Sequence, residues 1–64
     1  MIEMCELSVY IVEGDKESLF AEDIINLIQL DGKVEMRDLL GTIYVAEGVL
    51  KEVDITRERA TISR

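Results

Sequence analysis

The fold depends on the structure of one stretch, EDIINLIQL at residues 22–30. A helix would gather Ile24, Leu27 and Ile28 on one face, whereas a strand would place Leu27 on the opposite side from the two isoleucines. The stretch is short for a helix and rich in β-branched residues. The Asp-Gly pair at 31–32 that follows it is a strong hairpin signal between apolar runs. We therefore predict a strand, entered through a short turn at its first two residues, and keep a helix as the alternative.

Alternating apolar and polar residues continue on both sides of this stretch. Before it, residues 4–12 place Cys5 on the apolar side of a strand, and a Gly-Asp turn within 13–16 leads to a returning strand at 18–21. After it, similar short runs occupy residues 33–40, 42–46, 49–56 and 60–63. Five or six short strands joined by tight turns predict an all-β fold, namely a small SH3-like antiparallel β-barrel that is closed or nearly closed.

The size of the chain limits what it can do. With 64 residues and 7.3 kDa it allows one domain, over residues 1–64, and excludes a multi-layer enzyme. Hydrophobic residues make up 48% of the chain but aromatic residues only 5%, so the core must be aliphatic. A single cysteine cannot form an internal disulfide, and small domains without one usually gain stability from a metal or from oligomerisation. We expect a homo-oligomer.

The charge of the chain argues against nucleic acid as a ligand. Fourteen acidic and seven basic residues give a formal charge of −7, which repels phosphate backbones and anionic membranes. Four basic residues could form a stripe for RNA, namely Lys51, Arg57, Arg59 and Arg64. The sequence places no aromatic residue among them to stack a base. No stretch reaches the roughly 20 apolar residues of a membrane span, and the acidic N-terminus lacks the features of a signal peptide, so we expect a cytoplasmic protein.

Cys5 is the residue that points most clearly to chemistry. The chain has no histidine, which excludes common zinc-finger spacings and Ser-His or Cys-His catalytic pairs. If translation begins at Met4, removal of the initiator leaves an amine and a thiolate on one residue, and these form a five-membered chelate. Such donors suit square-planar nickel or copper(II), and nickel is the natural candidate in a reducing cell. The alternative is that Cys5 is a small hydrophobic core residue.

Several short motifs occur in a fixed order from Met4 to the C-terminus: MCE at 4–6, VY at 9–10, GDK at 14–16, EDI at 22–24, DGK at 31–33, DLLG at 38–41 and EGVLKEV at 47–53. Together they resemble the small nickel-binding proteins of the CooT type. The resemblance implies an SH3-like barrel that forms a homodimer, binds Ni(II) through Cys5 and carries nickel for carbon monoxide dehydrogenase maturation. It implies no catalysis, and it implies main-chain nitrogens around Met4 to Glu6 as co-ligands.

The chain departs from that family at its start, because Met1-Ile2-Glu3 precede the usual first residue. These residues are either an N-terminal extension or the result of a misassigned start codon. If they are present in the cell, Cys5 has no free α-amine. Its thiolate must then combine with neighbouring amides or with a second thiolate across a dimer.

We therefore expect a dimeric, non-enzymatic nickel carrier with a client metalloenzyme, whose metal site lies at Cys5, Met4 and Glu6, at or near the dimer interface. The alternative is a non-catalytic adaptor or RNA-binding module in which the cysteine is buried. The RNA-binding label given to such proteins rests on fold analogy. RNA binding through phosphates should fall steeply with salt, whereas nickel binding by a thiolate should not.

Overall fold

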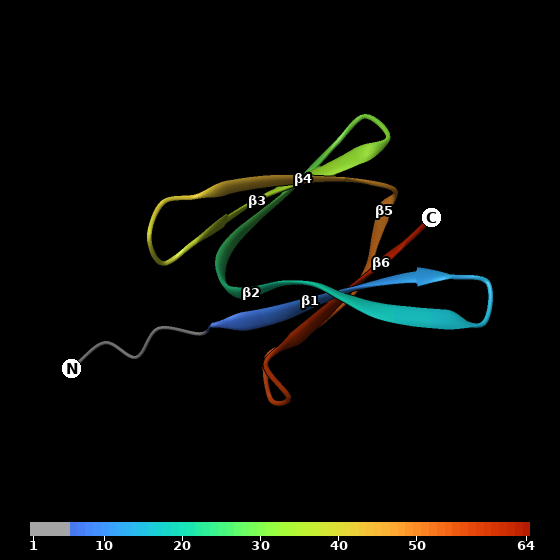
Figure 1. Ribbon diagram of the computed structural model, residues 1–64, viewed down its shortest axis with the longest axis horizontal. Helices are drawn as coiled ribbons and strands as arrows, with labels where there is room; N and C mark the ends of the chain where they lie inside the picture. The colour runs from blue at the N-terminus through green and yellow to red at the C-terminus, as the bar shows by residue number, and fades with distance from the viewer. Residues whose placement is uncertain (1–5) are drawn as a thin grey trace.

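The computed structural model describes residues 6–64, which form six β-strands and no helix (Figure 1). The strands are β1 (Leu7–Glu13), β2 (Lys16–Leu30), β3 (Lys33–Asp38), β4 (Ile43–Glu47), β5 (Val49–Asp54) and β6 (Arg59–Ser63). The predicted small all-β, SH3-like fold is confirmed, as are the turns at 14–15 and 31–32.

The stretch at residues 22–30 is the second half of β2, so the helical alternative is wrong. β2 is 15 residues long and pairs first with β1 and then, from Ile24 onward, with β3. Asp23 has a φ of 57°, and both ladders shift register around this part of the strand. The expected turn at 22–23 is thus a bend within one continuous strand. This bend allows β2 to belong to both halves of a strongly curved sheet.

One pairing differs from the predicted antiparallel arrangement. The sheet order is β4-β3-β2-β1-β6-β5, and β1 lies parallel to β6, with Val9 opposite Ala60 and Ile11 opposite Ile62. The other four pairings are antiparallel. Turn signals identify strands that are neighbours in sequence, but β6 reaches β1 only after the chain has passed through four other strands. Side-chain alternation is the same in both directions, so it does not reveal the direction of this pairing.

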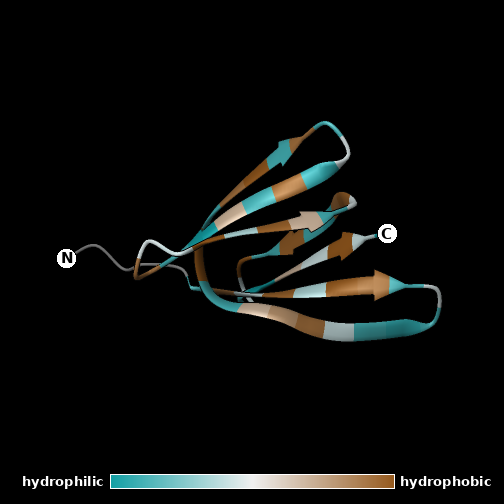
Figure 2. Ribbon diagram, turned by 45° about the horizontal axis from the view of Figure 1, so that its top comes forward, coloured by the Kyte–Doolittle hydropathy of each residue, from teal (hydrophilic) through white to brown (hydrophobic). Residues whose placement is uncertain are grey.

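The sheet curls into a half-barrel with β4 and β5 as its edge strands, so the closure is less complete than expected (Figure 2). The Gln29 side chain connects the β2–β3 hairpin to β5. Its Oε1 accepts a hydrogen bond from the backbone N–H of Leu50 at 2.6 Å. Its Nε2 donates to the carbonyls of Lys33 and Gly48 at 3.0 and 3.3 Å. A side-chain amide therefore takes the place of part of the strand pairing that a closed barrel would have.

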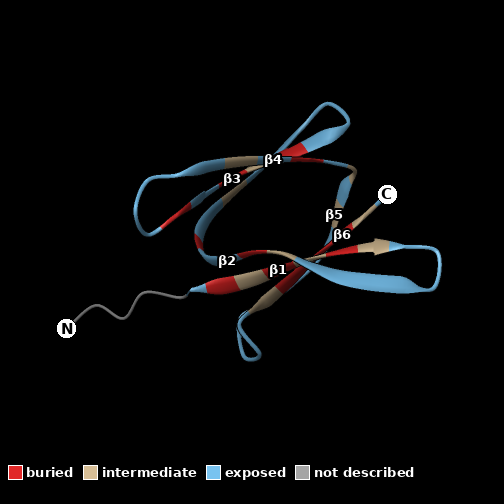
Figure 3. Cartoon of the chain, viewed as in Figure 1, coloured by how far each residue is buried: buried red, intermediate tan, exposed pale blue. Residues whose placement is uncertain are grey.

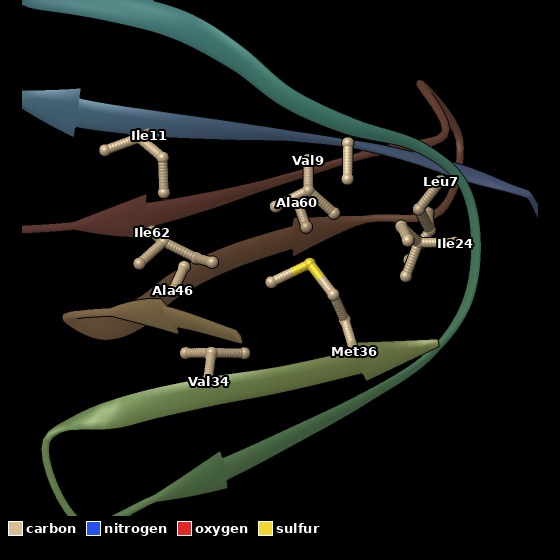
Figure 4. Packing of buried hydrophobic residues seen from close by; sticks show 10 residues of the cluster. Leu7, Val9, Ile11, Ile24, Val34, Met36, Ala46, Ala60 and Ile62 are labelled. Atoms are coloured by element: carbon tan, nitrogen blue, oxygen red, sulfur yellow. The ribbon is translucent and has the colours of Figure 1, made fainter. Parts of the chain in front are cut away.

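The core fills the inside of the curl and is aliphatic, as the composition predicted (Figure 4). Alternate residues of the strands point inward, which produces the red segments of Figure 3. Phe20 and Tyr44 pack against the core, and their rings contact each other edge to face with centroids 6.4 Å apart. The buried hydrophobic residues are Leu7, Val9, Ile11, Ala21, Ile24, Val34, Met36, Ala46, Ala60 and Ile62.

Candidate functional site

Two of the three residues predicted for the metal site lie outside the described part of the chain. These are Met4 and Cys5. Glu6 is the first described residue, is exposed, and immediately precedes β1. The assignment of a nickel site to these residues therefore stays a prediction, and the structure defines the surroundings into which the site would be built.

The beginning of β1 is held firmly on both sides. Leu7 is buried and pairs with Ile24 of β2. The backbone N–H of Ser8 donates to the carbonyl of Glu58 at 2.9 Å, at the end of the β5–β6 turn. Because one neighbour is a strand and the other a turn that leads directly into β6, the start of β1 next to Glu6 has a well-defined position.

The β3–β4 turn lies beside this same end of the molecule, in both views of the ribbon (Figures 1 and 2). The backbone N–H of Leu39 donates to the carbonyl of Asp23 at 3.1 Å. Asp23 is adjacent to Ile24, which pairs with Leu7. The turn, the bend of β2 and the start of β1 therefore form one connected corner.

Residues 6–64 contain no group of three or more His, Cys, Asp or Glu side chains arranged to hold a metal ion. Carboxylates are present at this corner, on Glu6, Asp23 and Glu58, and all three residues are exposed. A metal site at this end therefore needs donors from the segment that contains Cys5.

Asp38 is a buried carboxylate at the end of β3, and the sequence did not reveal a role for it. It is 8% exposed, and its Oδ1 accepts hydrogen bonds from the backbone N–H groups of Leu40 and Thr42, both at 2.9 Å. Its Oδ2 accepts from the Tyr44 hydroxyl at 3.1 Å. An inward-facing Asp followed by a Gly- and Thr-containing turn is the sequence signal that could have identified this arrangement.

The environment of Asp38 favours its ionised form. Burial by itself raises the pKa of the Asp38 carboxyl, but the hydrogen bonds from Thr42, Tyr44 and Leu40 outweigh it and hold this pKa below its ordinary value of 3.8. The hydrogen bond to Asp38, with burial and nearby negative charge, raises the pKa of Tyr44 above its ordinary value of 10.0. The pair is thus a carboxylate and a neutral phenol at neutral pH.

An Asp38→Asn variant should melt several degrees below the wild-type protein at neutral pH, because an amide donates where the carboxylate accepts. The pKa of Asp38 is lower in the folded protein than in the unfolded chain, so the ionised carboxylate stabilises the fold above about pH 3.8. This contribution to stability is lost as the pH falls through the folded-state pKa. The difference in melting temperature should therefore shrink in acid. Glu22→Gln, at an exposed position, is the control and should melt like the wild type at neutral pH. If the difference in melting temperature between Asp38→Asn and the wild type stays constant until the protein unfolds in acid, the negative charge of Asp38 does not stabilise the fold.

Among the described residues, one basic side chain lies over an aromatic ring, and that basic group is also paired with a carboxylate. The Arg59 guanidinium lies 4.4 Å from the centre of the Tyr10 ring, an arrangement that the sequence did not reveal. The same guanidinium is bound by Glu17 at 2.6 Å. Lys51 and Arg57 of the predicted basic stripe line the same groove as Arg59. Glu52 and Asp54 also line it, so the positive and negative side chains balance and the groove offers no net positive charge to a phosphate chain.

The described residues include no helix that is long and apolar enough to cross a membrane.

Comparisons with known proteins identify the group to which the chain belongs. The profile of the family described as CO dehydrogenase accessory protein CooT matches residues 4–63. No curated protein is significantly similar in sequence. A crystal structure of a CooT-type protein from Carboxydothermus hydrogenoformans is 32% identical, superposes with a TM-score of 0.83, and the match covers 94% of this chain and 97% of that one. The chain therefore belongs to the CooT family of CO dehydrogenase accessory proteins.

Proposed function

We propose that the protein is a nickel carrier that delivers Ni(II) during CO dehydrogenase maturation, with the Cys5 thiolate as the main ligand. The observation that carries the proposal is the family match, which starts at Met4 and so makes Cys5 the second residue of the matched segment. The accessory role of the family favours a protein that assists an enzyme and catalyses nothing itself. CO dehydrogenase is then the client metalloenzyme, in the cytoplasm.

The donor chemistry agrees with nickel as the cargo. The sequence supplies one thiol and no imidazole, so a thiolate ligand has to come from Cys5. A thiolate and the main-chain nitrogens from Met4 to Glu6 are donors that suit nickel, whereas carboxylates alone suit magnesium or calcium. Carrying a metal also requires that the site be reached by the client, and the chain leaves the sheet at the exposed residue Glu6. A homodimer would supply a second thiolate to the same ion.

Native mass spectrometry of the protein expressed from its own start codon, with and without Ni²⁺, tests the proposal. One spectrum reports the N-terminal residue, the oligomeric state and the metal stoichiometry. We expect a dimer that gains nickel and no longer does so after alkylation of Cys5. If a chain with an intact N-terminus and a free thiol gains no nickel, the carrier function is refuted and a non-catalytic adaptor becomes the better description.

A further inference from the structure

We infer that the unpaired edge of β4 is a docking site for CO dehydrogenase, which would add an extended segment of its own chain to this sheet as a further strand. The inference rests on the proposed function, because it takes the client enzyme as the partner. It concerns a contact between proteins, and it can be tested without nickel.

The two edge strands of the sheet differ in how they are protected. An edge strand exposes unpaired backbone N–H and C=O groups, and soluble proteins usually protect it with charged side chains, above all lysine, or with a β-bulge. β5 has both kinds of protection. It carries Lys51, Glu52 and Asp54, and its ladder with β6 shifts register between Leu50 and Glu52. β5 is therefore a poor template for a further strand.

β4 lacks this protection along most of its length. It ends the sheet order, with β3 as its one partner among the described strands. Its sequence is IYVAE, so its only charged residue comes last, and its ladder with β3 is regular from Ile43 to Glu47. Arg64 covers the end of the strand, because its Nε donates to the carbonyl of Glu47 at 3.4 Å. The remaining edge, from Ile43 to Ala46, is uncharged and regular, which makes it a template for strand addition.

The outward face of β4 offers apolar contacts to an added strand. Ile43 and Val45 are two residues apart, so they lie on the same face, and they are 53% and 51% exposed. Val45 lies opposite Glu35 of β3, which lies opposite Ile28 of β2. A further strand would extend this row with a side chain beside Val45. Its backbone would supply hydrogen bonds, and two apolar side chains at alternate positions would supply specificity.

The charge of the chain favours a different protein over a second copy as the source of this strand. Two copies with a formal charge of −7 repel each other, whereas a basic surface is attracted. The family assists CO dehydrogenase, so that enzyme is the partner we name. The uncharged edge requires a segment with apolar residues at alternate positions, and the acidic protein around it favours Lys or Arg flanking that segment.

A matched pair of substitutions tests the edge, Val45→Lys against Val53→Lys. The two valines lie on the two edge strands, are 51% and 41% exposed, and change the net charge equally when replaced by lysine. Lysine at position 45 gives β4 the protection that β5 already has. The dissociation constant for nickel-free CO dehydrogenase would be measured by biolayer interferometry. The melting temperature and oligomeric state of each free variant would be measured alongside.

We expect Val45→Lys to raise the dissociation constant for the enzyme about tenfold or more, while Val53→Lys stays within about twofold of the wild type. Binding of the wild type should weaken as the NaCl concentration rises. Hydrogen exchange of the wild-type protein gives a second measurement that needs no variant. Backbone amides of β4 should exchange more slowly in the complex, whereas those of β5 should not change.

The inference is wrong if the wild type does not bind the enzyme, if both variants bind it equally well, or if the slowed amides lie outside β4. A change in the oligomeric state of free Val45→Lys would assign the edge to a contact between copies instead. Affinity that is independent of NaCl would exclude a basic partner. A protein that docks through β4 but binds no nickel would refute the carrier proposal and leave this inference intact.

Discussion

A Cys5→Ser variant should bind nickel about 100-fold more weakly than the wild-type protein, or not at all. The sequence offers no other thiol and no histidine, and a serine hydroxyl does not lose its proton at neutral pH to become a ligand. The carboxylates of residues 6–64 form no group of three that could take over the ion. The dissociation constant for Ni²⁺, obtained by competition with a chromophoric chelator, measures the effect.

Two neighbouring substitutions serve as controls for this experiment. Met4→Leu and Glu6→Gln both keep the thiol and the main-chain nitrogens, so each should change nickel affinity by less than about tenfold. Binding to the wild type should weaken as the pH falls, because the thiol must lose its proton to coordinate the metal. Wild-type affinity in Cys5→Ser would refute the carrier proposal. A loss in Glu6→Gln as large as that in Cys5→Ser would instead identify a carboxylate as the principal ligand.

The local features of the fold could be predicted from the sequence because they depend on neighbouring residues. The hairpin turns at 14–15 and 31–32 follow from their Gly and Asp residues, and the inward faces of β1 and β3 follow from alternation. The parallel contact between Val9 and Ala60 joins strands that are far apart in sequence, and no local signal encodes it. The Asp38–Tyr44 bond was missed for a similar reason, since the turn that brings the two side chains together had not been defined.

The candidate site was predicted in a different way. Composition left Cys5 as the one possible thiolate ligand, and the resemblance in the order of motifs assigned that thiolate to nickel. The family match agrees with this order, whereas the donors themselves lie outside the described residues. The exposure of Leu40 could not be predicted, because an apolar pair at the end of a β-run normally suggests a buried strand end.

A Gly48→Ala variant should lose about 3 kcal/mol or more of its free energy of unfolding, which corresponds to a fall of roughly 12 °C or more in melting temperature for a domain of this size. Gly48 joins β4 to β5 and has a φ of 133°, which side chains rarely allow. An added Cβ would lie 2.5 Å from the carbonyl oxygen of Ser63 and 2.9 Å from Cγ2 of Ile62. Ile62 is fully buried and Ser63 belongs to the β6 ladder, so neither can move away.

Gly48 itself also has little freedom to shift. Its N–H donates to the carbonyl of Gly32 at 3.0 Å, and its carbonyl accepts from Gln29, so the residue is tied to the β2–β3 hairpin on one side and packed against β6 on the other. Gly14→Ala is the matched control, because Gly14 also has a positive φ, of 62°, but no atom within 4 Å of an added Cβ. Gly14→Ala should lose only ~1 kcal/mol of its free energy of unfolding, which is the cost of placing alanine in the left-handed backbone conformation. Thermal unfolding of both variants separates the effect of the steric contact from that of backbone strain. If Gly48→Ala and Gly14→Ala lose the same free energy of unfolding, the contact with β6 does not restrict residue 48.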